Sequence, residues 1–143
     1  MRYLFLLLAM SCIALPTAAA GAPVEGYWKT IDDETGKAKS IVKTYVEDGV
    51  LYGKVVELLN RPEGDENPVC EECEGNRKDQ PIKGMVFLWG MERDGDVWTD
   101  GTILDPANGK TYDCKIWLED GKLMVRGYVA FFYRTQEWLP VER

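Results

Sequence analysis

The stretch TYDCKIWLEDGKLMVRGYV, residues 111–129, contains two runs of alternating apolar and polar side chains on either side of Asp120-Gly121. A period of two is typical of a half-buried β-strand, because successive side chains of a strand point to opposite faces. An Asp-Gly pair accepts the positive φ angles that a tight hairpin turn requires. The stretch therefore predicts a β-hairpin, with Ile116 and Leu118 on the apolar face of its first strand.

The same pattern recurs along the chain. Further Asp-Gly or Asn-Gly pairs begin at Asp48, Asp94 and Asn108, and each separates two runs of strand character. The expected strands are Gly26–Thr30, Lys39–Glu47, Val50–Leu59, Lys83–Met91, Val97–Leu104, Thr111–Leu118, Lys122–Val129 and Arg134–Val141. No stretch has a sustained helical period. We therefore predict an all-β fold, a single small antiparallel up-and-down barrel of about eight strands.

The two ends of this meander carry residues that suit a closed barrel. Trp28 lies in the first expected strand, and Arg134 and Trp138 lie in the last. First and last strands meet in a closed barrel, so a guanidinium on one can stack on an indole of the other. We predict a clasp of these three residues, in which Arg134 packs on Trp28 across the seam.

Residues 1–20 have the pattern of a cleavable secretory signal peptide. A basic start precedes an apolar run that is too short to span a bilayer, and the segment ends in an Ala-x-Ala site. We predict cleavage after Ala20, which leaves residues 21–143 as one exported domain in the periplasm or outside the cell. An uncleaved anchor is the alternative interpretation of the segment.

The composition disfavours several classes of function. The chain has a formal net charge of −7 and no histidine. An acidic surface repels phosphate backbones and anionic lipid head groups, so we expect no nucleic-acid partner and no peripheral membrane role. Without histidine the chain lacks the usual general base, metal ligand and pH switch. We accordingly expect no catalytic residues, no metal site and no cofactor, and no transmembrane segment after cleavage.

A long polar segment, residues 60–80, interrupts the meander and is here named the acidic loop. At this length a loop is more often functional or covalently pinned than an ordinary connector. It contains Cys70 and Cys73, which we expect to form a structural disulfide because the close pair meets most readily in an oxidising compartment. Cys114 shares a strand face with Ile116 and is then left as a buried, free thiol.

The Cys-x-x-Cys spacing has two other interpretations. A redox-active pair needs positive surroundings, whereas Glu71, Glu72 and Glu74 flank these cysteines and raise the thiol pKa. A zinc site would need a carboxylate to complete the three cysteines that remain after cleavage, because the chain has no histidine.

Several spaced motifs, taken together, are similar to a known family. They are Gly26-Tyr27-Trp28-Lys29-Thr30, Cys70-x-x-Cys73, Pro81-Ile82-x-Gly84, Gly101-x-Ile103-Leu104-Asp105-Pro106-x-Asn108-Gly109-Lys110-x-Tyr112, Leu123-x-Val125-Arg126-Gly127-Tyr128 and Arg134-Thr135-Gln136-x-Trp138. The chain resembles, over essentially its whole length after residue 20, the bacterial secreted family called domain of unknown function 2147. The resemblance implies a bacterial origin, export and a lipocalin-like or calycin-like barrel. It implies no particular activity.

The apolar strand faces supply the candidate ligand-binding residues. A barrel of eight strands is either filled by its own side chains or holds one small ligand. The candidates inside the barrel are Val42, Val46, Tyr112, Ile116, Leu118, Leu123 and Val125, whose modest volumes favour a narrow apolar pocket. Arg126 is added either as a cation over a tyrosine ring or as an anchor for an anionic head group.

Three functions follow from these observations, and the first is our expectation. It is a non-enzymatic barrel that binds a small apolar or amphipathic molecule. The alternative is an envelope interaction or structural protein with a filled barrel and an acidic loop that contacts another protein. The third is an enzyme using Asp or Glu, which Asp32, Asp33 and Asp105 support poorly because they lie where Asp usually caps a turn.

Overall fold

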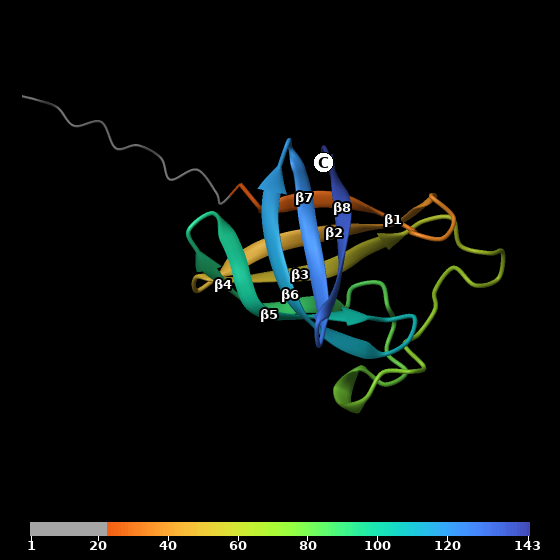
Figure 1. Cartoon of the computed structure of the whole chain (residues 1–143). Helices are drawn as coiled ribbons and strands as arrows, with labels where there is room; N and C mark the ends of the chain where they lie inside the picture. Colours follow the sequence, from red (N-terminus) through yellow and green to blue (C-terminus); the bar gives the residue numbers. More distant parts are fainter. Residues whose placement is uncertain (1–22) are drawn as a thin grey trace, which may run out of the picture.

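The computed structural model describes residues 23–143, so the predicted signal peptide and its cleavage site lie outside the described residues. The strands are β1 (Gly26–Ile31), β2 (Ala38–Glu47), β3 (Val50–Leu58), β4 (Val86–Asp94), β5 (Val97–Asp105), β6 (Lys110–Glu119), β7 (Lys122–Val129) and β8 (Phe132–Val141), with one short 3₁₀ helix, η1 (Gly75–Arg77). Each strand pairs with the next, and β8 pairs with β1, which closes the barrel (Figure 1). The predicted fold class is confirmed. Within this part of the chain, no helix is long and apolar enough to cross a bilayer.

The connections fall at two different ends of the barrel. Two-residue turns at positions 48–49, 95–96 and 120–121 join β2 to β3, β4 to β5 and β6 to β7 at one end. The other end, which we call the loop end, carries the β1–β2 loop, the acidic loop, the β5–β6 turn and the β7–β8 turn. All the long connections therefore lie together at the loop end.

Side chains from opposite walls meet inside the barrel. The rings of Phe87 on β4 and Trp138 on β8 lie with their centroids 5.9 Å apart, although three strands lie between β4 and β8 in either direction around the barrel. Met91 packs on the backbone of Gly101 so closely that a Cβ there would overlap the methionine sulfur. Leu51, which is fully buried, belongs to the same core. These side chains belong to one buried cluster inside the barrel, packed as in protein cores generally.

The seam between the first and last strands corrects one prediction. Trp28 lies opposite Pro140, and pairing between β1 and β8 extends only as far as Lys29 and Leu139. Arg134 is the third residue of β8 and lies near the loop end, where it pairs with Asp33 at 3.0 Å and its side chain is 72% exposed. The predicted clasp is wrong because β1 pairs only with the last residues of the longer β8. Six residues of extended strand, about 20 Å, separate Arg134 from the position opposite Trp28.

Candidate functional site

The residues predicted to line a pocket belong to the core or to its edge. Val42, Ile116, Leu123 and Val125 are buried in the core cluster. Val46 and Leu118 are partly buried and pack against this cluster. Tyr112 lies toward the loop end, where its hydroxyl is 3.3 Å from the Nδ2 of Asn108. Most of these side chains thus fill the volume that we expected them to surround.

Arg126 lies on the outer wall of the barrel, not among the interior candidates. It follows the inward-facing Val125 on β7, so strand alternation directs it outward. Its guanidinium carbon is 4.9 Å from the centroid of the Trp117 ring and 4.3 Å from that of Tyr133. The cation-over-tyrosine interpretation is therefore correct, whereas the inclusion of Arg126 among cavity residues is wrong.

Two shallow hollows stand out, and both lie outside the barrel interior. One, of about 460 Å³, lies beside the acidic loop and is lined by eight residues between Asn76 and Val86, including Arg77 and Lys83. The other, of about 440 Å³, lies over β5, β6 and β7, next to Asp100 and Tyr128. Neither is an enclosed apolar pocket of the kind that binds a lipid or pigment.

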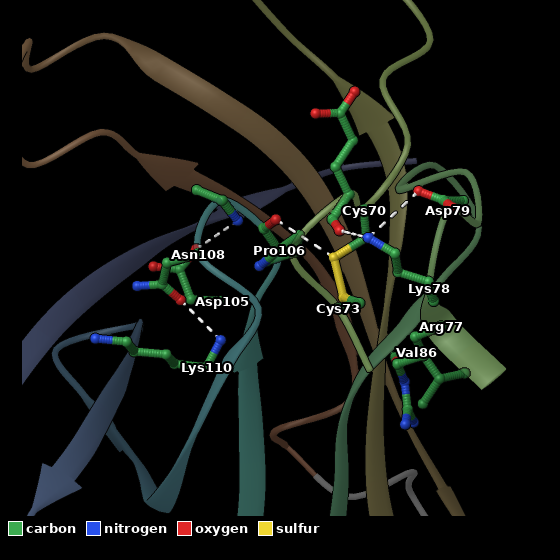
Figure 2. Close-up of a disulfide and its surroundings, with 12 residues drawn as sticks. Cys70, Cys73, Arg77, Lys78, Asp79, Val86, Asp105, Pro106, Asn108 and Lys110 are labelled. Carbon is green, nitrogen blue, oxygen red and sulfur yellow. Dashed lines mark hydrogen bonds and ion pairs between the residues drawn. A yellow bond between two sulfur atoms is a disulfide. The ribbon is translucent and has the colours of Figure 1, made fainter. Parts of the chain in front are cut away.

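The acidic loop is pinned by the disulfide that the sequence predicts. Cys70 and Cys73 are bonded, and both are buried. Figure 2 shows the bridge beside the β5–β6 turn, where the Sγ of Cys70 is 3.4 Å from the carbonyl oxygen of Pro106. Gly109 completes this contact, because a Cβ there would overlap the backbone carbonyl of Glu72. The loop thus packs on its neighbouring turn through backbone that tolerates no extra side chain.

Further contacts hold the acidic loop against the barrel. Val69 and Pro81 form an isolated antiparallel bridge, which closes the segment between them. The guanidinium of Arg77 lies 4.1 Å from the ring centroid of Trp89 on β4, and its Nε donates a hydrogen bond to the carbonyl of Val86. The polar segment is consequently a packed structure with a defined shape.

The carboxylates of the acidic loop point into solvent. Those exposed are Glu63, Asp65, Glu66, Glu71, Glu72, Glu74 and Asp79. Opposing charges on the loop are few: Arg61 pairs with Asp65, and Lys78 lies 3.8 Å from Asp79. The loop therefore presents a negative surface, part of which is fixed to the barrel by the disulfide and by Arg77.

Cys114 is free and buried, as predicted. Burial raises the pKa of the Cys114 thiol to about 12, because the thiolate would lose its hydration inside the barrel wall. A thiol in this state is a poor nucleophile at neutral pH.

The acidic residues considered for catalysis have turn roles. Asp32 accepts hydrogen bonds from the backbone N–H groups of Thr35 and Glu34, which hold its pKa below the usual range. Asp105 caps the β5–β6 turn in the same way by accepting from Ala107. In the part of the chain that the structure describes, no three Cys, Asp or Glu side chains are grouped as metal ligands.

Sequence reasoning missed the turn between β7 and β8. Phe131, Phe132 and Tyr133 are 98%, 79% and 61% exposed, and Val129 beside them is 54% exposed. The available signal was the apolar run Val-Ala-Phe-Phe-Tyr at residues 129–133. Its residues 130 and 131 form the two-residue turn, where Gly, Asn or Asp is usual.

Comparison with known proteins agrees with this architecture. The family model described as "Uncharacterized protein conserved in bacteria (DUF2147)" matches residues 26–139. A solved structure described as protein HP1028 from the human pathogen Helicobacter pylori, which belongs to the lipocalin family, superposes with a TM-score of 0.71. It shares 17% identity, and the match covers 82% of each chain, so the likeness concerns the fold. The search of curated proteins gives no match.

Proposed function

The chain belongs to the bacterial family DUF2147, and we propose that it is an exported, non-enzymatic protein whose filled barrel presents the acidic loop to another protein. The observation that carries this proposal is the contact of Phe87 and Trp138 across the interior. Side chains that meet from opposite walls support a filled interior over the small apolar ligand that we first expected. We therefore favour the alternative function, in which this lipocalin-like barrel contacts another protein of the cell envelope.

The shape of the acidic loop supports a role in binding. Its disulfide, the Val69–Pro81 bridge and the stacking of Arg77 on Trp89 hold it in one arrangement before any partner arrives. A preorganised surface loses little conformational entropy on binding, and this favours affinity. Its exposed carboxylates suit a protein with a basic surface, because complementary charge speeds association and selects the partner.

Two features support export. Disulfides persist in oxidising compartments and are rare in the cytosol, and the Cys70–Cys73 bridge is such a bond. The pattern of residues 1–20 is typical of a secretory signal. Both features are consistent with a location in the periplasm or outside the cell.

We propose a non-enzymatic protein because the candidate acidic residues lack the environment that catalytic acids require. Asp32 and Asp105 are occupied as turn caps, and the pKa of Asp32 is lowered, whereas a general acid needs a raised pKa.

Site-specific photo-cross-linking in the native envelope tests the protein contact. A photoreactive residue at Glu71 or Glu72 should give a discrete cross-linked species, and the same residue at Asp48 or Asp120, at the opposite end of the barrel, should not. With the photoreactive residue at Glu71, the added substitution Glu72→Lys should weaken the adduct if negative charge recruits the partner. Equal cross-linking from both ends would contradict a loop-specific contact.

A second measurement separates this function from ligand storage. Wild-type protein should neither displace a fluorescent fatty-acid probe nor retain an apolar molecule in native mass spectrometry. A bound one-to-one apolar ligand would return the ligand-binding hypothesis to first place.

A further inference from the structure

The tip of the β7–β8 hairpin is the largest apolar feature exposed by residues 23–143. Val129, Phe131, Phe132 and Tyr133 are consecutive or nearly so, and each exposes more than half of its surface. Monomeric proteins rarely leave contiguous apolar patches of this kind without a function. We call these four residues the hairpin tip.

The hairpin tip extends past its supporting strands. Pairing between β6 and β7 ends at Asp113 and Tyr128, so Val129 has no partner on that side. On the other side, β1 pairs with β8 only from Leu139 onward. Val129 and Phe132 occupy the register of inward-facing residues, yet they lie beyond the barrel rim. The tip is consequently apolar on both faces and at its turn. Because it extends beyond the neighbouring strands, it forms a convex projection.

An aromatic ladder with an unpaired cation stands directly behind the tip. The rings of Tyr128 and Tyr133 lie 5.9 Å apart, and Arg126 is stacked between Tyr133 and Trp117. The Nε of Arg126 donates to the hydroxyl of Thr135 at 2.7 Å. Among residues 23–143, no carboxylate lies within ion-pairing distance of this guanidinium, so its terminal nitrogens are available to an anion.

The local charge of the hairpin differs from that of the chain. Residues 121–136 contain three basic residues and no acidic residue, in a protein with 24 Asp and Glu. Asp113 lies opposite Tyr128, but Lys115 follows it opposite Arg126. Arg134 is a second cation near the tip and is exposed, although it is paired with Asp33. The hairpin is thus the part of this acidic molecule that an anionic group can approach.

We propose that the hairpin tip inserts into the surface of a phospholipid membrane, with Arg126 binding a lipid phosphate behind it. A convex element that is apolar on every side can insert into a fluid lipid surface, whereas a flat protein partner would cover only one of its sides. Interfacial segments bury their apolar residues about 5–10 Å deep, so phosphates would lie above the inserted rings. Tyr and Trp suit this level because their rings are apolar and their polar atoms stay hydrated.

The acidic charge of the rest of the molecule limits how it docks. An anionic membrane repels most of its surface, including the acidic loop at the same end, so contact is confined to the hairpin tip and rests on its apolar side chains and Arg126. From the sequence we expected no peripheral membrane role. The proposal keeps that expectation for every surface except the hairpin tip. The acidic loop leaves the barrel at the same end, so the tip would hold it close to the bilayer.

Vesicle co-sedimentation of the processed protein tests the proposal. Binding is expected to phosphatidylethanolamine vesicles containing a minority of phosphatidylglycerol. The variant Phe131→Ser, Phe132→Ser should weaken partitioning at least about tenfold, because it removes two apolar side chains from the inserted tip. Val69→Ser is the matched control, since Val69 is the other exposed large apolar residue of the described chain and lies in the acidic loop. It should bind as wild type does.

Two further variants locate the contact. When vesicles are added, the difference in tryptophan fluorescence between Phe131→Trp and wild type should shift to shorter wavelength. Brominated acyl chains should quench this added fluorescence. Arg126→Gln should weaken binding about fivefold on phosphatidylglycerol-containing vesicles. Thermal unfolding of each variant checks the fold. Absence of wild-type binding, or equal binding by the double serine variant, would overturn the proposal. Tip-dependent cross-linking to an envelope protein without vesicle binding would also overturn it and identify the tip as a protein contact.

Discussion

The indole Nε1 of Trp28 donates a hydrogen bond to the hydroxyl oxygen of Thr44, 2.9 Å away, and Thr44 donates in turn to the carbonyl of Val24 at 2.5 Å. All three residues are buried. This chain links the segment entering β1 to β2 and satisfies the polar atoms that the interior encloses. The polar atom of Trp28 is thus bonded to β2, on the other side of β1 from the seam with β8 where we had expected the arginine clasp.

Replacing Thr44 by Val should therefore destabilise the barrel. The shape is kept, but a buried N–H and a buried carbonyl lose their partner, which costs about 1–3 kcal/mol. Urea denaturation measures the free energy of unfolding. In a double-mutant cycle with Trp28→Phe, the coupling should be about 1 kcal/mol; additive effects would mean that the two groups do not interact.

Arg134 should contribute little to stability. Its ion pair with Asp33 is solvent-exposed, and such pairs are worth about 0–1 kcal/mol. We expect Arg134→Ala to lower the free energy of unfolding by no more than this. A loss comparable to that of a buried aromatic truncation would indicate that Arg134 packs into the seam after all.

Truncating Trp138 should open the interior. Trp138→Ala removes one of the two rings that meet across the barrel and should cost about 3–5 kcal/mol. If the variant remains folded, it should take up a small apolar probe that wild type excludes, because the cavity is lined by apolar side chains. Equal uptake by both proteins would show that the wild-type interior already has space.

Reducing the disulfide should loosen the acidic loop and leave the barrel folded. A bridge that closes a four-residue ring is worth about 2 kcal/mol in the chain-entropy model. Dithiothreitol should lower the unfolding free energy by this amount and expose residues 60–80 to proteolysis. The variant Cys70→Ala, Cys73→Ala should not respond to the reductant, whereas Cys114→Ala should respond as wild type does.

Cys114 should make stability fall at alkaline pH. Its pKa is about 12 in the fold, against 9.0 for an ordinary thiol. Between these values the unfolded chain has lost the proton that the folded chain keeps, so the unfolding free energy decreases as pH rises, by up to about 1.4 kcal/mol per pH unit. The full contribution is present below pH 9. The difference between wild type and Cys114→Ala isolates this effect from the tyrosines and lysines; a pH-independent difference would contradict it.

The alternating pattern and the paired turn residues determined the strands by themselves. Asp48-Gly49 and Asp120-Gly121 each form the expected two-residue turn, because local backbone preference and strand period act over a few residues. The pairing of Cys70 with Cys73 was predictable for the same reason, since the two residues are neighbours in the chain.

Only the tertiary structure decided what the barrel encloses and what it exposes. Whether Val125 lines a pocket or joins a packed core depends on the rings of Phe87 and Trp138, which come from opposite walls. The position of Arg134 depends on the stagger between β1 and β8, which follows from closure of the whole sheet. Phe131 is exposed because its hairpin outruns both neighbouring strands. Such relationships join residues distant in the chain, so a pattern with a period of two carries no information about them.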